Sequence, residues 1–236
     1  MAKLTGRKIL ITGISRGVGL ETARLFLAEG AELFGVGKDP ARLDRVRNEL
    51  DPSGERLTVF AADLVEPEAA QRIKAAVSKR WHSLDVLLNN AGIQIDAGAR
   101  GFVDNTEAVL KKSMEVNLMA PYRLSLALLP LLKAGTEPRI VQVSSGAGTF
   151  AAMKDANIAS YRLSKWALNG FTLLLSAELA GQVAVNAFDP GWVKTDLGGP
   201  NAPGSPLESA HGALAIVTLP FSETGKFWKD GKEIPF

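Results

Sequence analysis

The chain has 236 residues, of which 46% are hydrophobic and 22% are charged, a composition that predicts one globular domain spanning residues 1–236. Its 27 basic and 25 acidic residues leave a formal net charge of +2, and no run of like charges suggests a nucleic acid or an anionic membrane as partner. Cysteine is absent, which excludes disulfides, thiolate catalysis and cysteine metal sites, and the spacing of His82 and His211 indicates no metal.

The N-terminal segment MAKLTGRK lacks the apolar core of a signal peptide, and no apolar run reaches bilayer length, so we expect no membrane segment and a cytoplasmic location. Short apolar runs then alternate with longer segments of helical period. The expected strands are residues 8–12, 31–37, 57–63, 84–90, 139–145, 183–188 and 225–229. Helices are expected after the turn at residues 12–19, over residues 40–50, 67–81 and 106–132, from the segment SYRLSKWA to about residue 179, and after residue 206. This order predicts an α/β fold with a doubly wound parallel sheet, Rossmann-type, of about seven strands with helices on both faces.

The segment TGISRGVG, residues 12–19, lies between the first strand and the first helix, where a doubly wound sheet binds the pyrophosphate of a dinucleotide. Its glycines follow the spacing G-x-x-x-G-x-G, whereas the dinucleotide fingerprint is G-x-G-x-x-G. Glycine lets a phosphate approach the backbone, and the helix start offers free N–H groups and a positive dipole end. Glycines also end strands for structural reasons, but this position favours cofactor binding. The candidate contacts in the turn are Gly13, Ser15, Arg16, Gly17, Val18 and Gly19.

The end of the second strand reads GVGKDP and bears on the choice of nicotinamide coenzyme. At this position a carboxylate accepts from the ribose 2′-hydroxyl of NAD, and a cation accommodates the 2′-phosphate of NADP. Lys38 ends the strand and Arg16 can reach the same region, so two cations are available and we predict NADP(H) in preference to NAD(H). Asp39 is the counter-evidence, because an error of two residues in the predicted strand end would place its carboxylate at the discriminating position and favour NADH. Lys38 and Asp39 could also simply form an exposed turn.

Tyr161 and Lys165 in SYRLSKWA are spaced i, i+4, which stacks them one turn apart on the same side of the expected helix. Taken alone, the pair could be a surface contact in which the lysine stem covers the ring. An ordinary phenol has a pKa of about 10, too high to exchange protons freely near neutrality. A neighbouring ammonium group favours the phenolate, so we expect Lys165 to lower the pKa of Tyr161.

These segments together resemble the short-chain dehydrogenase/reductase family over nearly the whole chain. The resemblance rests on TGISRGVG, on NNAG at residues 89–92, on Asn117, on VSS at 143–145, on YRLSK at 161–165 and on PGWVKTD at 190–196, which occur in the family's order. The loop GGPNAP and the tail TGKFWKDGKEIPF are similar to those of carbonyl-reductase-type members. The resemblance implies hydride transfer between nicotinamide and a carbonyl or alcohol carbon of a small-molecule substrate.

The resemblance also implies roles for four catalytic residues. Tyr161 would be the general acid/base, and Lys165 would hydrogen-bond the nicotinamide ribose. Ser145 would donate a hydrogen bond to the substrate oxygen, although Ser144 is a rival because strand alternation lets only one of the two face the cleft. Asn117 would hold a water that links Lys165 to solvent.

Three further turns would contact the cofactor if the resemblance holds. These are Asn90, Ala91 and Gly92 after the fourth strand, Asp63 and Leu64 after the third, and Pro190, Gly191, Val193 and Thr195 after the sixth. Thr195 would bond the nicotinamide carboxamide and Asp63 would contact adenine. Asp63 is almost as well suited to cap the next helix, and residues 90–92 could be an ordinary turn.

Several alternatives stay open. A 3-oxoacyl-(acyl-carrier-protein) reductase would need a basic docking patch, for which Arg100, Lys111, Lys112 and Arg123 are scattered candidates. A non-catalytic NADP(H)-binding sensor would not need Ser145, Tyr161 and Lys165, so the presence of these residues argues against it. Sugar-nucleotide epimerases share the tyrosine–lysine pair, but they resemble longer chains with an added substrate lobe for which this chain has no room. A homo-oligomer, dimer or tetramer, could form through the two long helices that contain Asn117 and Tyr161. The outer faces of these helices would include Leu124, Leu128, Phe171 and Leu175, although these residues could equally belong to the core. The segment between VSS and Tyr161 is slightly longer than usual in the family, and its Phe150 and Met153 could line the substrate pocket or simply pack there.

Overall fold

The computed structural model describes residues 2–236 and contains one sheet of eight strands in the order β3-β2-β1-β4-β5-β6-β7-β8. All neighbouring strands are parallel except β7 and β8. The strands are β1 (Lys8–Thr12), β2 (Glu32–Gly37), β3 (Leu57–Ala61), β4 (Val86–Asn89), β5 (Arg139–Val143), β6 (Ala184–Phe188), β7 (Phe227–Lys229) and β8 (Lys232–Ile234). The predicted doubly wound sheet is therefore confirmed, with one short antiparallel strand, β8, that the sequence analysis did not predict.

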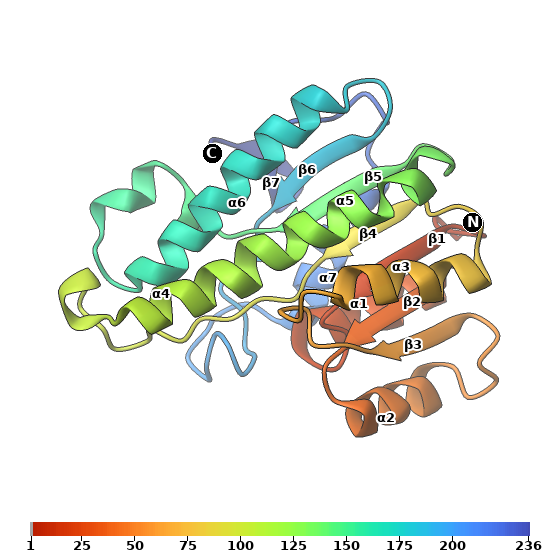
Figure 1. Ribbon diagram of the computed structural model, residues 1–236, viewed down its shortest axis with the longest axis horizontal. Helices are drawn as coiled ribbons and strands as arrows, with labels where there is room; N and C mark the ends of the chain where they lie inside the picture. The colour runs from red at the N-terminus through yellow and green to blue at the C-terminus, as the bar shows by residue number, and fades with distance from the viewer. Residues whose placement is uncertain (1) are drawn as a thin grey trace.

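Helices cover both faces of this sheet (Figure 1). They are α1 (Gly17–Ala28), α2 (Pro40–Leu50), α3 (Ala69–Arg80), α4 (Glu107–Met114), α5 (Ala120–Lys133), α6 (Ala159–Glu178) and α7 (Pro206–Val217). Figure 1 shows α3, α5 and α6 in front of the sheet and α1 and α7 behind it. None of the helices in residues 2–236 is both long and apolar enough to cross a bilayer.

The central strands read as continuous apolar runs because both of their faces are buried. In β1, Ile9 and Ile11 belong to the core on the side of α1, α2 and α7, whereas Leu10 belongs to the core on the side of α3, α5 and α6. Leu124 and Leu128 of α5 and Leu175 of α6 lie in this second core and are at most 4% exposed. They are therefore core residues, and the suggestion that they form an outer, oligomer-forming face is wrong.

The helix predicted over residues 106–132 is interrupted. Between α4 and α5 the chain forms one π-helical turn, Glu115–Met119, with Asn117 at its centre. A π-turn widens the helix by one residue and is frequent at functional sites. The apolar spacing that predicts a helix does not distinguish this single wide turn, so one helix was expected where the structure has two.

Candidate active site

The predicted catalytic side chains meet where β4 and β5 end and α6 begins. Tyr161 is 8% exposed and Lys165 is 4% exposed, and the Lys165 Nζ lies 5.8 Å from the centroid of the Tyr161 ring. The same Nζ donates to the backbone oxygen of Val143 at 2.8 Å, the last residue of β5. The Tyr161–Lys165 pair is thus part of the interior, and the alternative of a surface contact is wrong.

Asn117 is fully buried and is tied to the chain that follows β4. Its Oδ1 accepts from the backbone N–H of Ile93 at 2.8 Å, and its Nδ2 donates to the Ile93 oxygen at 2.8 Å and to Ser164 Oγ at 3.0 Å. A Cβ atom on Gly92 would lie 3.3 Å from Asn117 Oδ1 and 3.4 Å from the Lys165 Nζ. The π-turn therefore brings Asn117 next to Gly92 and Lys165.

The two serines after β5 have different surroundings. Ser144 is buried, and its hydroxyl donates to Asn169 Oδ1 at 2.6 Å inside the protein. Ser145 is partly exposed, its Oγ accepts from Ala147 N at 3.1 Å, and it is near enough to the phenol of Tyr161 to lower the pKa of that group. Ser145 is thus the serine that lies at the tyrosine.

The electrostatics of the phenol differ from the sequence-based expectation. Burial raises the pKa of Tyr161 to about 12, the hydrogen bond with Ser145 lowers it, and the charges of Asp189 and Asp96 raise it further. Burial also lowers the pKa of Lys165 to about 8, against which Asp189 acts. The expectation that Lys165 lowers the phenol pKa is wrong for this geometry, because desolvation dominates for both groups.

Two buried carboxylates near Tyr161 were missed by the sequence analysis. Asp189 is 4% exposed and follows β6, where its carboxylate accepts from Gly191 N at 2.9 Å and pairs with the Lys229 Nζ at 3.1 Å. Asp96 is 3% exposed and accepts from the backbone N–H of Tyr161 at 3.1 Å. Asp189 directly precedes the Pro190–Gly191 turn, which is a signal that could have been noticed, whereas nothing in the local sequence marks Asp96.

The glycine turn after β1 has the close backbone approach that a pyrophosphate requires. A Cβ on Gly19 would lie 2.3 Å from the Gly13 oxygen, and one on Gly13 would lie 3.0 Å from the Asn90 Nδ2. Gly13 and Gly17 have φ of +72° and +58°, the left-handed region that favours glycine. Asn90 locks the turn to the end of β4, since its Nδ2 donates to the Thr12 oxygen at 2.8 Å.

The start of α1 fits an anion. Its N-cap residue, Arg16, makes no side-chain cap, and its first turn contains no acidic residue. Within residues 2–236, the Ser15 Oγ is buried and has no hydrogen-bond partner. It lies close to the end of β2, since a Cβ atom on Gly37 would be only 2.5 Å from it. Free N–H groups, a positive helix end and an unpartnered hydroxyl together suit a phosphate group. The residues present therefore fit the predicted dinucleotide.

The candidate coenzyme-discriminating residues lie at the ends of β2 and β3. The exposed Lys38 pairs through its Nζ with Asp63 Oδ2 at 2.7 Å, a contact that raises the pKa of Lys38 and lowers that of Asp63. Asp39 caps α2, accepting from Ala41 N at 2.9 Å and Arg42 N at 3.2 Å. Its Oδ1 atom is therefore engaged at the start of α2. Leu64 is half-buried directly after Asp63.

The turn after β6 lies against the glycine turn, on the side away from Asn90. A Cβ on Gly17 would lie 3.1 Å from Thr195 Cγ2, and Arg16 forms an ion pair with Asp196. Gly191 has φ of +81°, and Val193 is buried and bridges to Gly204. The structure thus brings the turns after β1, β4 and β6 together with the Tyr161 cluster.

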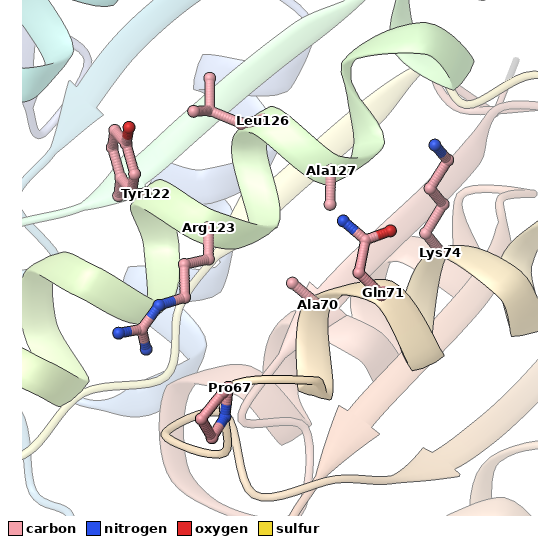
Figure 2. Close-up of a pocket in the computed structure, with 8 residues that line it drawn as sticks. All are labelled: Pro67, Ala70, Gln71, Lys74, Tyr122, Arg123, Leu126 and Ala127. Atoms are coloured by element: carbon pink, nitrogen blue, oxygen red, sulfur yellow. The ribbon is translucent and has the colours of Figure 1, made fainter.

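No metal site is evident in the described chain: residues 2–236 contain no group of three or more histidine, aspartate or glutamate side chains able to hold an ion. The expectation of no metal stays a prediction. The exposed groove between α3 and α5 (Figure 2) contains none of the predicted site residues. It has a volume of about 340 Å³ and is lined by Pro67, Ala70, Gln71, Lys74, Tyr122, Arg123, Leu126 and Ala127.

Comparison with known proteins gives consistent matches. A sequence model of the family described as short chain dehydrogenase matches residues 7–204. (+)-Neomenthol dehydrogenase of Arabidopsis thaliana is 28% identical, with 95% of each chain covered. Oxidoreductase UcpA of Escherichia coli is 34% identical over 84% of this chain and 73% of its own, and 3-oxoacyl-[acyl-carrier-protein] reductase FabG of Vibrio cholerae is 31% identical over 82% and 76%. NADPH-bound carbonyl reductase from chicken fatty liver has the same fold, with a TM-score of 0.90, 28% identity and coverage of 99% and 100%.

Proposed function

The chain belongs to the short-chain dehydrogenase family of oxidoreductases, and from this premise we propose that it is an NADPH-dependent carbonyl reductase with Tyr161 as general acid/base. The observation that carries the proposal is the buried cluster of Asn117, Ser145, Tyr161 and Lys165 beside an uncapped glycine turn. The residues suited to proton transfer and those suited to dinucleotide binding thereby lie at the same edge of the sheet.

The dinucleotide would be held by the three turns described above. The N–H groups at the start of α1 would receive the pyrophosphate, and Lys38 and Arg16 would receive the 2′-phosphate after leaving Asp63 and Asp196. Because Asp39 caps α2 through its Oδ1, turning its carboxylate toward the 2′-hydroxyl of NAD would cost the helix this cap. The other proposed contacts are Leu64, Asn90, Ala91 and Gly92, and, after β6, Pro190, Gly191, Val193 and Thr195.

The bound NADPH would supply a hydride to the carbonyl carbon of the substrate. Ser145 would orient the carbonyl by donating to its oxygen, and the Tyr161 hydroxyl would transfer its proton to that oxygen as negative charge develops there. With its pKa raised to about 12 the phenol is protonated near neutrality and can act as the donor, and the hydrogen bond with Ser145 acts against burial by lowering this pKa. The proton given up by Tyr161 would be replaced from solvent through Lys165 and a water held at Asn117, whose amide is fixed by the Ile93 backbone.

The substrate would be an apolar ketone or aldehyde. Large apolar side chains are exposed on the loops that follow β4, β5 and β6, among them Ile95 at 46%, Phe150 at 71% and Trp192 at 60%. Large apolar side chains exposed on loops beside the proposed site are typical of a surface that binds an apolar ligand. Met153, by contrast, is half-buried in the turn after Phe150.

The experiment that tests this function is a screen of carbonyl compounds in which NADPH and NADH oxidation are followed in parallel. We expect turnover of apolar ketones or aldehydes, with a higher kcat/KM for NADPH. Absence of turnover with any carbonyl compound, together with tight NADPH binding, would instead support the non-catalytic sensor.

A reductase of carrier-bound 3-oxoacyl groups is the alternative that the relative FabG suggests. Three of the basic residues considered for docking have acidic partners: Arg100 pairs with Asp104 at 3.2 Å, Lys111 with Glu107 at 2.5 Å, and Arg123 with Glu115. Because exposed ion pairs are weak, these contacts alone do not exclude docking, and the exposed apolar side chains near the site carry the preference for free ketones or aldehydes. Faster turnover of carrier-bound acyl chains than of free ketones would reverse this preference.

We also propose that copies of the chain associate as a homo-oligomer, dimer or tetramer. The outer faces of α5 and α6 expose Tyr122, Leu126 and Leu174, the last at 75%, and the Tyr122 ring lies 5.4 Å from the half-buried Phe171. The groove of Figure 2 continues this face toward α3. Light scattering at several protein concentrations measures the oligomeric state, and a monomer throughout would contradict the proposal.

A further inference from the structure

The first turn of α6, which contains Tyr161, has no local cap. The residue before the helix, Ile158, has φ +44° and ψ +41°, makes no side-chain cap, and is followed by no acidic residue in the first turn. A β-branched residue rarely adopts this left-handed conformation, and the first N–H groups of a helix have no carbonyl partner of their own. A cap from elsewhere in the chain is therefore needed.

Asp96 supplies this cap from the loop after β4. Its Oδ2 accepts from the backbone N–H of Tyr161 at 3.1 Å, although the two residues are 65 positions apart in sequence. The same loop makes a second tie, since Asn105 Nδ2 donates to Ser160 Oγ at 3.1 Å. The position of the catalytic tyrosine thus depends on a loop that lies outside α6.

The second oxygen of Asp96 has an unusual environment. Within residues 2–236, Asp96 Oδ1 is buried and has no hydrogen-bond partner, and no lysine or arginine forms an ion pair with this carboxylate. A buried carboxylate with an unpaired oxygen costs stability, so its presence at this position calls for an explanation.

The other charged groups near the phenol are partly neutralised. Lys165 lies on the same helix, with its Nζ donating to the Val143 oxygen. Asp189, which follows β6, is paired with Lys229. The cations nearest in sequence to Asp96 and Tyr161 are engaged as well, Arg100 with Asp104 and Arg162 with Asp155 at 2.6 Å. Asp96 is therefore the buried negative charge at Tyr161 that no cation balances.

We propose that Asp96 is a positioning residue for the proposed reaction, which fixes Tyr161 through the first turn of α6 and whose charge keeps the phenol protonated until a carbonyl oxygen takes the proton. This role rests on the proposed function. A negative charge beside a phenol disfavours the phenolate, and the charges of Asp189 and Asp96 act in this direction beside burial, the main cause of the raised pKa of Tyr161. The phenol therefore keeps its proton available to a carbonyl oxygen over a wider range of pH.

The chain allows a direct test because it has only two tyrosines, Tyr122 and Tyr161. In a Tyr122→Phe background, which keeps the aromatic ring next to Phe171, the ultraviolet absorbance of phenolate reports on Tyr161 alone. Asp96→Asn removes the charge but keeps an oxygen that can accept from the Tyr161 N–H. We expect Asp96→Asn to move the phenol titration to lower pH, and Asp104→Asn, an exposed residue of the same loop, to leave it unchanged.

An unchanged or higher titration midpoint in Asp96→Asn would overturn the proposal. A phenol that stays protonated in Asp96→Asn up to alkaline unfolding would overturn it too, because the charge of Asp96 would then not be what holds the proton on Tyr161. The pH profile of carbonyl reduction is a second readout: the rate should fall at lower pH in Asp96→Asn than in the parent, whereas a uniform loss of kcat without a shift would mean a cap and nothing more.

Loss of the cap could prevent folding, and a second background guards against this outcome. Ile158→Gly replaces a β-branched residue in the left-handed region, which should stabilise the helix start, and the Asp96→Asn comparison is then repeated in that background. The titration measures the Tyr161 phenol without any turnover. An unshifted titration would therefore overturn the role of Asp96 while the proposed reductase activity stands, and absence of turnover would overturn the reductase activity without affecting the titration.

Discussion

Gly19→Ala should damage both the stability of the protein and its coenzyme binding. The added Cβ would lie 2.3 Å from the Gly13 oxygen and 2.6 Å from the Asn90 Nδ2, whereas ordinary contact begins at 3.4 Å. The Gly13 backbone must therefore move by about 1 Å, and overpacking of this kind typically costs about 1–3 kcal/mol. The movement occurs in the turn whose N–H groups would receive the pyrophosphate, so NADPH affinity should fall as well.

Gly170→Ala is the matched control. Gly170 is also helical, but it lies on the exposed side of α6, and a Cβ there would meet nothing within 4 Å. Alanine in place of glycine within a helix stabilises it by about 1 kcal/mol, which corresponds to a rise in Tm of about 2–4 °C for a chain of this size.

The assay is thermal unfolding of the two variants and the parent, combined with titration of NADPH against tryptophan fluorescence. We expect Gly19→Ala to lower the Tm and weaken NADPH binding, and Gly170→Ala to raise the Tm with binding unchanged. Parent-like stability and affinity in Gly19→Ala would refute the reasoning that the turn depends on close backbone approach.

Ser145→Ala should lower kcat by about 10²–10³-fold if the hydroxyl orients the carbonyl. Ser144→Ala should instead lower the free energy of unfolding, measured in urea, by about 1–3 kcal/mol, because it leaves the buried Asn169 Oδ1 unsatisfied. The reverse pattern would exchange the roles of the two serines. Lys38→Ala should raise the KM for NADPH and leave that for NADH nearly unchanged, and an equal effect on both in steady-state kinetics would remove Lys38 from coenzyme selection. The pKa of Lys165 is about 8 in the folded protein, below the ordinary value of 10.5. Between pH 8 and pH 10.5 the unfolded chain therefore binds more protons than the folded one, so the contribution of Lys165 to stability rises with pH. Urea unfolding at pH 7 and pH 10 should show this rise in the parent relative to Lys165→Met, and identical pH dependence would contradict it.

Much of the fold could be predicted because its strands are buried on both faces. Runs such as Ile9, Leu10 and Ile11 are apolar without alternation, and that pattern indicates a parallel sheet. The glycine turn and the Tyr161–Lys165 spacing are local, so their positions also follow from sequence. By contrast, β8 is only three residues long and pairs at the edge, where no apolar run marks it.

The electrostatics of the site could not be predicted because they depend on contacts between distant segments. Asp96 reaches the backbone of Tyr161 across 65 positions, and the charge of Asp189, which follows β6, acts on the phenol of α6. The burial of Leu124 and Leu175 likewise depends on which side of the helix pair meets the sheet. Burial reverses the expected shift in the phenol pKa, and its extent is a property of the folded chain.

The claim on which the account depends most is that the Tyr161 hydroxyl delivers the proton. The most direct measurement is turnover of Tyr161→Phe with a carbonyl substrate of the parent, together with its affinity for NADPH. We predict that turnover is abolished while NADPH affinity stays nearly unchanged, since phenylalanine keeps the ring and loses only the hydroxyl. Residual turnover close to that of the parent, or loss of NADPH binding with activity retained, would contradict the account.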